Sequence, residues 1–267
     1  MNKLQSKGFN RYQLADILSY EGLQRDLAEL TKCFENLPED PYAKGLNRFR
    51  RYSRAVILPI QDSIEWLPSI EVNGERYSEY FQGRFNPEHV DSYRKFSSLT
   101  MAAQENELLK KIILFDFHQT FWRKEDILLP VHVGVHFVKL LVKNNNEKAV
   151  SSPNNLHQDG EPFTFAHLIK RENVIGGINA IATPKNAGKL PSEIDKQELH
   201  ATFEISNPLD SYGVYDPMVS HYVSPVEKGI EDKPGVRSVI LIDFQPTVVA
   251  DVDENKNIPD IKQMVMV

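Results

Sequence analysis

The stretch Val131-His-Val-Gly-Val-His-Phe-Val138 alternates in residue character with a period of two. Successive side chains of a β-strand point to opposite faces, so this alternation predicts a strand with one buried face. The runs Phe163–Ile169 and Thr202–Ile205 alternate in the same way. Ser238-Val-Ile-Leu-Ile-Asp-Phe244 is instead a continuous β-favouring run, typical of a central buried strand. The second half of the chain therefore predicts several short strands without intervening helices.

The first third of the chain is mixed. Apolar residues at helical spacing predict an amphipathic helix over residues 12–35 and a second helix from Leu99 to about Trp122. Prolines and glycines punctuate the segment between them, which indicates loops with short strands. Helices packed outside a set of strands give a mainly β fold with flanking helices, a β-sandwich.

A chain of 267 residues is long for one domain and short for two, but no repeat or linker divides this one. We expect a single domain over residues 1–267. Its parts are a mixed N-terminal part over about 1–125, a strand-rich core over about 126–246 and a C-terminal tail over about 247–267.

Charge and cysteine content limit the classes of protein to which the chain could belong. The chain has 31 basic and 37 acidic residues, a net charge of -6, which argues against a nucleic-acid binder with a basic face. Its longest runs without charged residues are too short for a membrane helix, and the N-terminus carries no signal peptide. The single cysteine, Cys33, excludes an intrachain disulfide and fits a reducing compartment. We expect a cytoplasmic protein without nucleic-acid or membrane partners, and the sequence leaves open a monomer or a homo-oligomer.

The stretch Leu156-His-Gln-Asp-Gly160 is the strongest candidate for chemistry. His157 and Asp159 are two residues apart, so on a strand both point to one face. Alone, such a pair is most simply explained as a surface turn. Together with His221 and Arg237 further along, it favours a metal site. Two histidines and one carboxylate leave the opposite coordination positions open, as in non-haem Fe(II) oxygenases. Fe²⁺ held by these ligands keeps a net positive charge that favours an anionic co-substrate, which an arginine can clamp.

With these residues the sequence resembles the Fe(II)/2-oxoglutarate-dependent dioxygenases, and within them the bacterial free-amino-acid hydroxylases that include L-isoleucine 4-hydroxylase. The resemblance is carried by the segments 39–42, 50–54, 156–162, 165–168 with Gly176-Gly177, and 219–225 leading to Arg237. It implies a double-stranded β-helix (jelly roll) with Fe(II) as cofactor and 2-oxoglutarate and O₂ as co-substrates. It also implies His157, Asp159 and His221 as metal ligands and Arg237 as the 2-oxoglutarate-binding residue.

One position departs from the wider family pattern. Many members have Arg-x-Ser, whose hydroxyl helps to hold the 2-oxoglutarate carboxylate, but position 239 is valine here. Ser238 is adjacent to Arg237 and should face the other way on a strand. A second contact to that carboxylate must come from elsewhere in the chain.

Four further residues are candidates for binding a substrate. Tyr52 and Arg54 share one face of a predicted strand and could hold an amino acid's carboxylate, although a solvated basic face is the simpler explanation. Glu161 could receive the substrate ammonium or be a turn residue. His136 could line the active-site pocket or be a buried structural histidine. His167 is most simply a core residue.

These observations predict a dioxygenase that hydroxylates a side-chain carbon of a small free L-amino acid and releases succinate and CO₂. One alternative keeps the cofactors and acts on a carrier-bound amino acid or a peptide. Another is a non-catalytic jelly-roll protein that binds a metal or a small ligand. A third is a zinc hydrolase with the same three ligands, for which Arg237 has no evident use.

Overall fold

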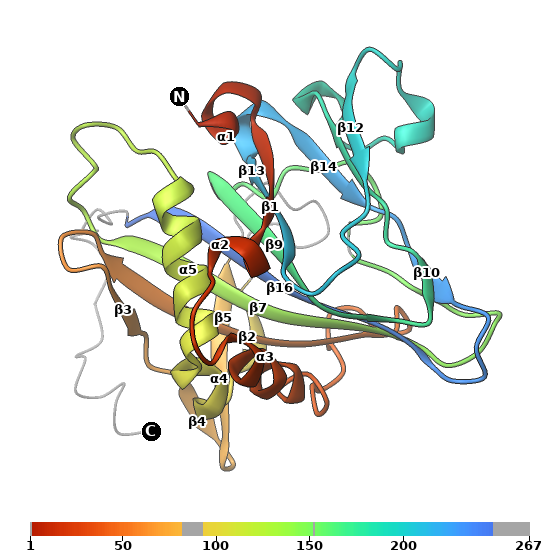
Figure 1. Ribbon diagram of the computed structural model, residues 1–267, viewed down its shortest axis with the longest axis horizontal. Coiled ribbons are helices and arrows are strands. Elements are labelled where there is room, and N and C mark those ends of the chain that lie inside the picture. The colour runs from red at the N-terminus through yellow and green to blue at the C-terminus, as the bar shows by residue number, and fades with distance from the viewer. Residues whose placement is uncertain (1, 82–92, 152, 248–267) are drawn as a thin grey trace, which may run out of the picture.

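The computed structural model describes residues 2–81, 93–151 and 153–247, and its main element is a seven-stranded antiparallel sheet (Figure 1). Across the sheet the strands are β1 (Phe9–Gln13), β13 (Asp210–Tyr215), β9 (Phe163–Glu172), β16 (Gly235–Pro246), β7 (Val131–Val142), β2 (Arg48–Leu58) and β3 (Ser63–Trp66). The predicted strands at 131–138, 163–169 and 238–244 all belong to this sheet. The run predicted to be central, β16, lies between β9 and β7 and pairs with both.

Three smaller sheets complete the strands. They are β10 (Val174–Gly176), β15 (Val226–Lys228) and β8 (Lys148–Ala149); β12 (Leu199–Phe203), β11 (Asn179–Ala182) and β14 (Ser220–Val223); and β4 (Ile70–Val72), β5 (Glu75–Phe81) and β6 (Tyr93–Ser97). Three short 3₁₀ helices are η1 (Pro184–Asn186), η2 (Pro191–Glu193) and η3 (Asp216–Met218). The predicted mainly β jelly roll is confirmed. The main sheet also takes β1, β2 and β3 from the N-terminal part, so no structural boundary falls near residue 126. The predicted tail, from residue 248 on, lies outside the described residues.

The two predicted helices are both interrupted. The first is replaced by the end of β1, α2 (Leu14–Ile17) and α3 (Leu23–Lys32), and the second by α4 (Met101–Glu105) and α5 (Glu107–Gln119). Gly22, at φ +100°, precedes α3 in a left-handed conformation. Asn106 leaves the helical region and caps α5, because its side chain accepts a hydrogen bond from the Leu109 amide. Both pieces of each segment contribute buried residues to the same core cluster, so periodicity alone did not reveal the breaks. A further short helix, α1 (Lys3–Lys7), precedes β1, and no helix in the described ranges is long and apolar enough to cross a membrane.

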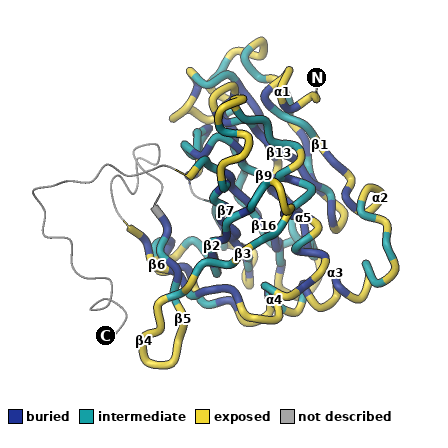
Figure 2. Tube along the Cα trace, turned by 90° about the vertical axis from the view of Figure 1, so that its left-hand side faces the viewer, coloured by how far each residue is buried: buried dark blue, intermediate teal, exposed yellow. Residues whose placement is uncertain are grey.

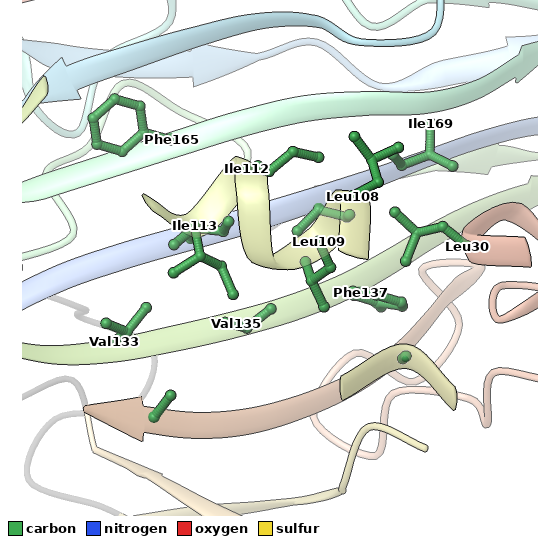
Figure 3. Packing of buried hydrophobic residues seen from close by; sticks show 14 of the residues in the cluster. Leu30, Leu108, Leu109, Ile112, Ile113, Val133, Val135, Phe137, Phe165 and Ile169 are labelled. Carbon is green, nitrogen blue, oxygen red and sulfur yellow. The ribbon is translucent and has the colours of Figure 1, made fainter. Parts of the chain in front are cut away.

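Helices α3 and α5 cover one face of the main sheet (Figure 1). Figure 3 shows Leu109, Ile112 and Ile113 of α5 against the apolar side chains of β7 and β9. The burial pattern agrees, because the dark-blue segments in Figure 2 concentrate in the central strands. The sheet residues on this face are the odd-numbered ones of β7 (Val133, Val135 and Phe137). Their even-numbered neighbours face the other side, where the candidate site lies.

A buried polar cluster ties α5 to the sheet. His167 of β9 bonds the Ser211 hydroxyl of β13 through Nδ1, at 2.9 Å, and Asp116 of α5 through Nε2, at 2.8 Å. The Ser211 hydroxyl donates to the Leu209 carbonyl, so it accepts the hydrogen of His167 Nδ1. All three side chains are essentially inaccessible to solvent, which confirms His167 as a core residue with satisfied ring nitrogens.

This cluster predicts a pH dependence of stability. Burial raises the pKa of Asp116 to about 6, although His167 opposes the shift. Between about pH 4 and pH 6 the folded protein therefore binds more protons than the unfolded chain, and the free energy of unfolding should fall as pH rises. Relative to the Asp116→Asn variant, wild type should lose about 1–3 kcal/mol over this range, at about 1.4 kcal/mol per pKa unit.

Urea denaturation at a series of pH values measures the difference between the two proteins. Asp62→Asn is the matched control, because its carboxylate pairs with His118 at 3.1 Å on the exposed surface and should contribute little at any pH. A wild-type-to-D116N difference that does not change between pH 4 and pH 6 would contradict the assignment.

Candidate active site

Two backbone hydrogen bonds bring together histidines that lie far apart in the sequence. The amide of His157 donates to the carbonyl of His221, and the amide of His221 donates to the carbonyl of His157, both at 2.9 Å. His221 lies on β14, and the two rings approach to 4.3 Å between centroids. This local antiparallel bridge positions both imidazoles on the same side of the cavity.

Asp159 completes the cluster that the sequence indicated. Its Oδ1 lies 3.6 Å from His157 Nε2, and its Oδ2 lies 3.2 Å from His221 Nε2. One ligand atom from each residue lies within 4.8 Å of the others, which fits a single ion. His157 Nδ1 donates to the Asn155 carbonyl at 2.8 Å, an outer contact that leaves Nε2 for the metal. His221 Nε2 is buried without a partner in hydrogen-bond geometry among the described residues, as expected of a ligand atom.

The charges of the three groups support each other. Burial alone would raise the pKa of Asp159, but the neighbouring imidazoles outweigh it and hold the pKa below its ordinary value. Burial alone would lower the pKa of His221, but the charge of Asp159 outweighs it and raises the pKa. The Asp159 carboxylate is therefore ionised, and it attracts protons or a cation to the two neighbouring imidazoles. A divalent cation is the natural replacement for the imidazole protons.

Asp216, which the sequence analysis did not identify, holds the loop that carries Asp159. Its Oδ1 accepts the Asp159 amide at 3.0 Å and its Oδ2 accepts the Gly160 amide at 2.9 Å. Gln158 also donates to the Asp216 carbonyl, at 2.6 Å. Asp216 begins η3, more than fifty residues from the loop it binds, so only the fold shows the connection.

Arg237 lines the same cavity as the three candidate ligands, with a volume of about 100 Å³. Its side chain is almost fully buried, makes no ion pair with any described residue, and its Nε has no hydrogen-bond partner there. Gly177, at φ +70°, leaves room for it, because a Cβ there would approach Nε to 3.1 Å. Burial lowers the pKa of Arg237 to about 10, so the guanidinium stays charged at neutral pH. A buried, uncompensated cation beside a metal site favours an anionic ligand.

Tyr212 is a candidate for the second contact that Val239 does not provide. It lies on β13, lines the same cavity and interacts electrostatically with Arg237. Burial raises the pKa of Tyr212 to about 12, so its hydroxyl keeps a proton to donate. Ser238 does not line this cavity, in agreement with the strand alternation.

A second cavity of about 70 Å³ adjoins the first and shares Asp159 with it. Six charged side chains line it: Arg48, Arg50, Arg94, Asp159, Glu161 and Asp243. His136 and Glu161, both predicted for the substrate, lie here, and Glu161 accepts a hydrogen bond from the Tyr80 hydroxyl at 3.0 Å. Burial raises the pKa of Glu161 and of Asp243, the latter to about 7, and the charge of Asp159 adds to both shifts. Both carboxyls would be ionised more readily beside a bound cation.

The other two predicted substrate residues lie elsewhere. Tyr52 and Arg54 line a separate cavity with His132, which contains none of the three candidate ligands. The Tyr52 ring stacks on the His136 ring, with 4.3 Å between the ring centroids, and so restricts the orientation of that ring. Arg50, on the same face of β2 and two residues before Tyr52, lines both cavities around Asp159 instead. Strand alternation identified the correct face, but not which of its arginines reaches the site.

A jelly roll that holds two histidines and a carboxylate around an open cavity is the arrangement of a non-haem iron oxygenase. The model of the 2OG-Fe dioxygenase family matches residues 31–243, most of the chain. The chain therefore belongs to the 2OG-Fe dioxygenases, enzymes that use Fe(II), 2-oxoglutarate and O₂, and the predicted family is confirmed.

Characterised relatives extend over most of the chain. The 3(1)-hydroxy-L-isoleucine 4-dioxygenase of Pantoea ananatis (strain AJ13355) is 29% identical over 227 residues, which cover 82% of this chain and 81% of the relative. The L-isoleucine-4-hydroxylase of Bacillus thuringiensis is 28% identical over 251 residues, covering 91% and 93%. The crystal structure of IDO from Bacillus thuringiensis superposes with a TM-score of 0.67 at 22% identity, covering 92% of this chain and 96% of that one, and supports the fold.

The role of Asp216 gives a prediction about metal affinity. Asp216→Ala should weaken Fe(II) binding about 10- to 100-fold, because it frees the loop of Asp159 without removing any candidate ligand. Anaerobic titration with Fe(II) measures the affinity. Asp210→Ala is the control, since Asp210 binds the amides of Ser206 and Asn207 in another loop, at 3.0 and 2.9 Å. Equal Fe(II) affinities for D216A and D210A would rule out a role of Asp216 in positioning the metal site.

Proposed function

We propose that this dioxygenase hydroxylates an unactivated side-chain carbon of a small free L-amino acid, with 2-oxoglutarate converted to succinate and CO₂. The observation that carries the proposal is the second cavity, where guanidinium and carboxylate groups lie together beside Asp159. The names of two relatives, both of which refer to isoleucine or its derivative, support a free amino acid as substrate.

The residues of the chain have distinct tasks in this scheme. His157, Asp159 and His221 hold Fe(II), and Arg237 with Tyr212 binds the distal carboxylate of 2-oxoglutarate in the first cavity. The bound iron supplies the oxidising chemistry by which O₂ and 2-oxoglutarate functionalise a C–H bond. The surrounding protein excludes water and orients the substrate carbon toward the metal.

The charge content of the second cavity suits a zwitterion. Arg48 is already paired with Asp40 at 2.8 Å, and Asp159 belongs to the metal site. Arg50 lies in this cavity for an anion, and Glu161 and Asp243 for a cation. Burying either end of an amino acid without a partner is costly, and these groups remove that cost at both ends. Leu241 and Pro153 add apolar surface for the substrate side chain.

The cysteine content and the proposed substrate also bear on the cellular compartment. A chain with the single cysteine Cys33, acting on a free metabolite, suits the cytoplasm, and we propose that compartment. Its partners would be small molecules.

Substrate-dependent succinate formation tests the function. Fe(II)-loaded enzyme with 2-oxoglutarate and O₂ should release succinate faster when the correct free L-amino acid is added. The twenty protein amino acids and common non-protein ones form the screen. Stimulation by a peptide or a carrier-bound amino acid alone would show a different substrate class. Fe(II)- and 2-oxoglutarate-independent hydrolysis would indicate hydrolase chemistry.

A variant of Arg237 tests the co-substrate site. Arg237→Ala should raise the KM for 2-oxoglutarate about 30- to several-thousand-fold, because truncating one side of a buried charged pair costs about 2–5 kcal/mol. Fe(II) affinity should not change. Arg237→Lys should recover only part of the loss, since a lysine cannot form two parallel hydrogen bonds. A KM unchanged in R237A would assign the clamp to another residue.

A further inference from the structure

Asp243 is a buried carboxylate in a strand that is otherwise apolar. It lies on β16 between Ile242 and Phe244, both without solvent exposure, and is itself only 4% exposed. A carboxylate is rarely buried unless a partner or a function requires it. Its side chain faces the second cavity, together with those of His136 and Glu161.

The neighbouring strand is shaped to accept this carboxylate. Asp243 is directly opposite Gly134 of β7 in the antiparallel register. A Cβ at position 134 would collide with both carboxylate oxygens of Asp243, so any larger residue there would displace the group. Glycine weakens a strand interior, and in this strand it provides the space for Asp243.

His136 fixes the orientation of Asp243 and links it to Arg50. An Nη atom of Arg50 lies 2.5 Å from His136 Nδ1, and His136 Nε2 lies 2.8 Å from Asp243 Oδ2. A guanidinium can only donate, so Nδ1 accepts and the ring hydrogen is on Nε2, which donates to Asp243. Burial and the charges of Arg50 and Arg94 lower the pKa of His136 well below its ordinary value, which keeps the ring neutral. Stacking against Tyr52 holds the ring in place.

Arg50 and Asp243, at the two ends of this hydrogen-bonded series, each keep an unsatisfied atom. Asp243 Oδ1 and Arg50 Nε are buried and have no hydrogen-bond partner within the described part of the chain. Arg50 Nη1 also lies 4.0 Å from Asp40 Oδ2, an ion pair at the upper limit of distance, and Asp40 is in closer contact with Arg48 at 2.8 Å. An acceptor for a cation and a donor for an anion are therefore held at a fixed separation by one imidazole ring. An α-amino acid carries its ammonium and carboxylate on one carbon and needs such a fixed pair.

We propose that Asp243 binds the α-ammonium of the substrate and Arg50 its α-carboxylate, with His136 as the positioning residue between them. This inference rests on the proposed function, since it assigns the recognition groups of that amino-acid site. Glu161 is the competing acceptor, because its Oε2 is also unsatisfied. Glu161 accepts a hydrogen bond from the Tyr80 hydroxyl, whereas the His136 ring links Asp243, and not Glu161, to Arg50. Glu161 therefore lacks the fixed spacing from Arg50 that a zwitterion requires.

The decisive variant is Asp243→Asn. The amide oxygen can still accept the hydrogen bond from His136, but an NH₂ group replaces Oδ1 and repels an ammonium. We expect the Kd of the stimulating L-amino acid, with L-isoleucine as the first probe, to rise at least about 30-fold. The Kd of the corresponding 2-hydroxy acid, which lacks the ammonium, should change little. Calorimetry on the anaerobic Fe(II)–2-oxoglutarate enzyme measures both, and the affinities for Fe(II) and 2-oxoglutarate should be unaffected.

Glu161→Gln is the matched control, since it neutralises the other carboxyl of the same cavity. A selective loss of amino-acid binding in E161Q but not in D243N would overturn the inference and assign the ammonium to Glu161. Equal losses of amino acid and hydroxy acid in D243N would also overturn it, because they indicate general damage to the pocket. If D243N does not fold, Gly134→Ala displaces the same carboxylate without changing any charge and should give the same selective loss. A wild-type enzyme that binds no free amino acid would refute the proposed function itself.

Discussion

The antiparallel pairing of β16 with β7 on one side and β9 on the other is the constraint on which the site depends. Because side chains alternate along a strand, a shift of one residue would exchange its core face for its cavity face. Ile240, Ile242 and Phe244 lie in the helix-covered core, whereas Arg237 and Asp243 face the cavities. Six residues of strand separate these two charges, about 20 Å. One strand therefore spans the active site from the co-substrate end to the substrate end.

The buried histidine on the helix side of the sheet is fully hydrogen-bonded. Both ring nitrogens of His167 have partners, although Asp116 Oδ1 in the same cluster has none among the described residues. On the cavity side, buried atoms of Arg237 and Asp243 lack hydrogen-bond partners within the described ranges. Such atoms lower stability, because each has lost its water without gaining a hydrogen bond. Ligands that satisfy them recover that free energy, so the same atoms that weaken the empty fold favour binding.

The sequence predicted the parts of the fold that follow from alternation and local spacing. The strands of the core, the face shared by His157 and Asp159, and the opposite orientation of Arg237 and Ser238 could all be anticipated. Register could not, and it decides that Arg50 rather than Arg54 lies beside the candidate metal site. Contacts between distant segments, such as Asp216 with the Asp159 loop, have no local signal either. Asp243 does have a local signal, because it is a single acidic residue inside an apolar strand. The sequence does not show that it lies opposite Gly134, which leaves space for its carboxylate.

The cluster under α5 bears on how active sites are recognised by geometry. Ser211, His167 and Asp116 reproduce the hydrogen-bonded order of a serine-hydrolase triad, with the imidazole between hydroxyl and carboxylate. The ring nitrogens are exchanged, however, because Nε2 faces the serine and Nδ1 the carboxylate in that triad. Moreover, no substrate carbonyl can reach the Ser211 hydroxyl, which is sealed in the core and already donates to the Leu209 carbonyl. Here the same three residue types that carry out nucleophilic attack in hydrolases hold a helix against a sheet. Solvent access distinguishes the catalytic use from the structural one.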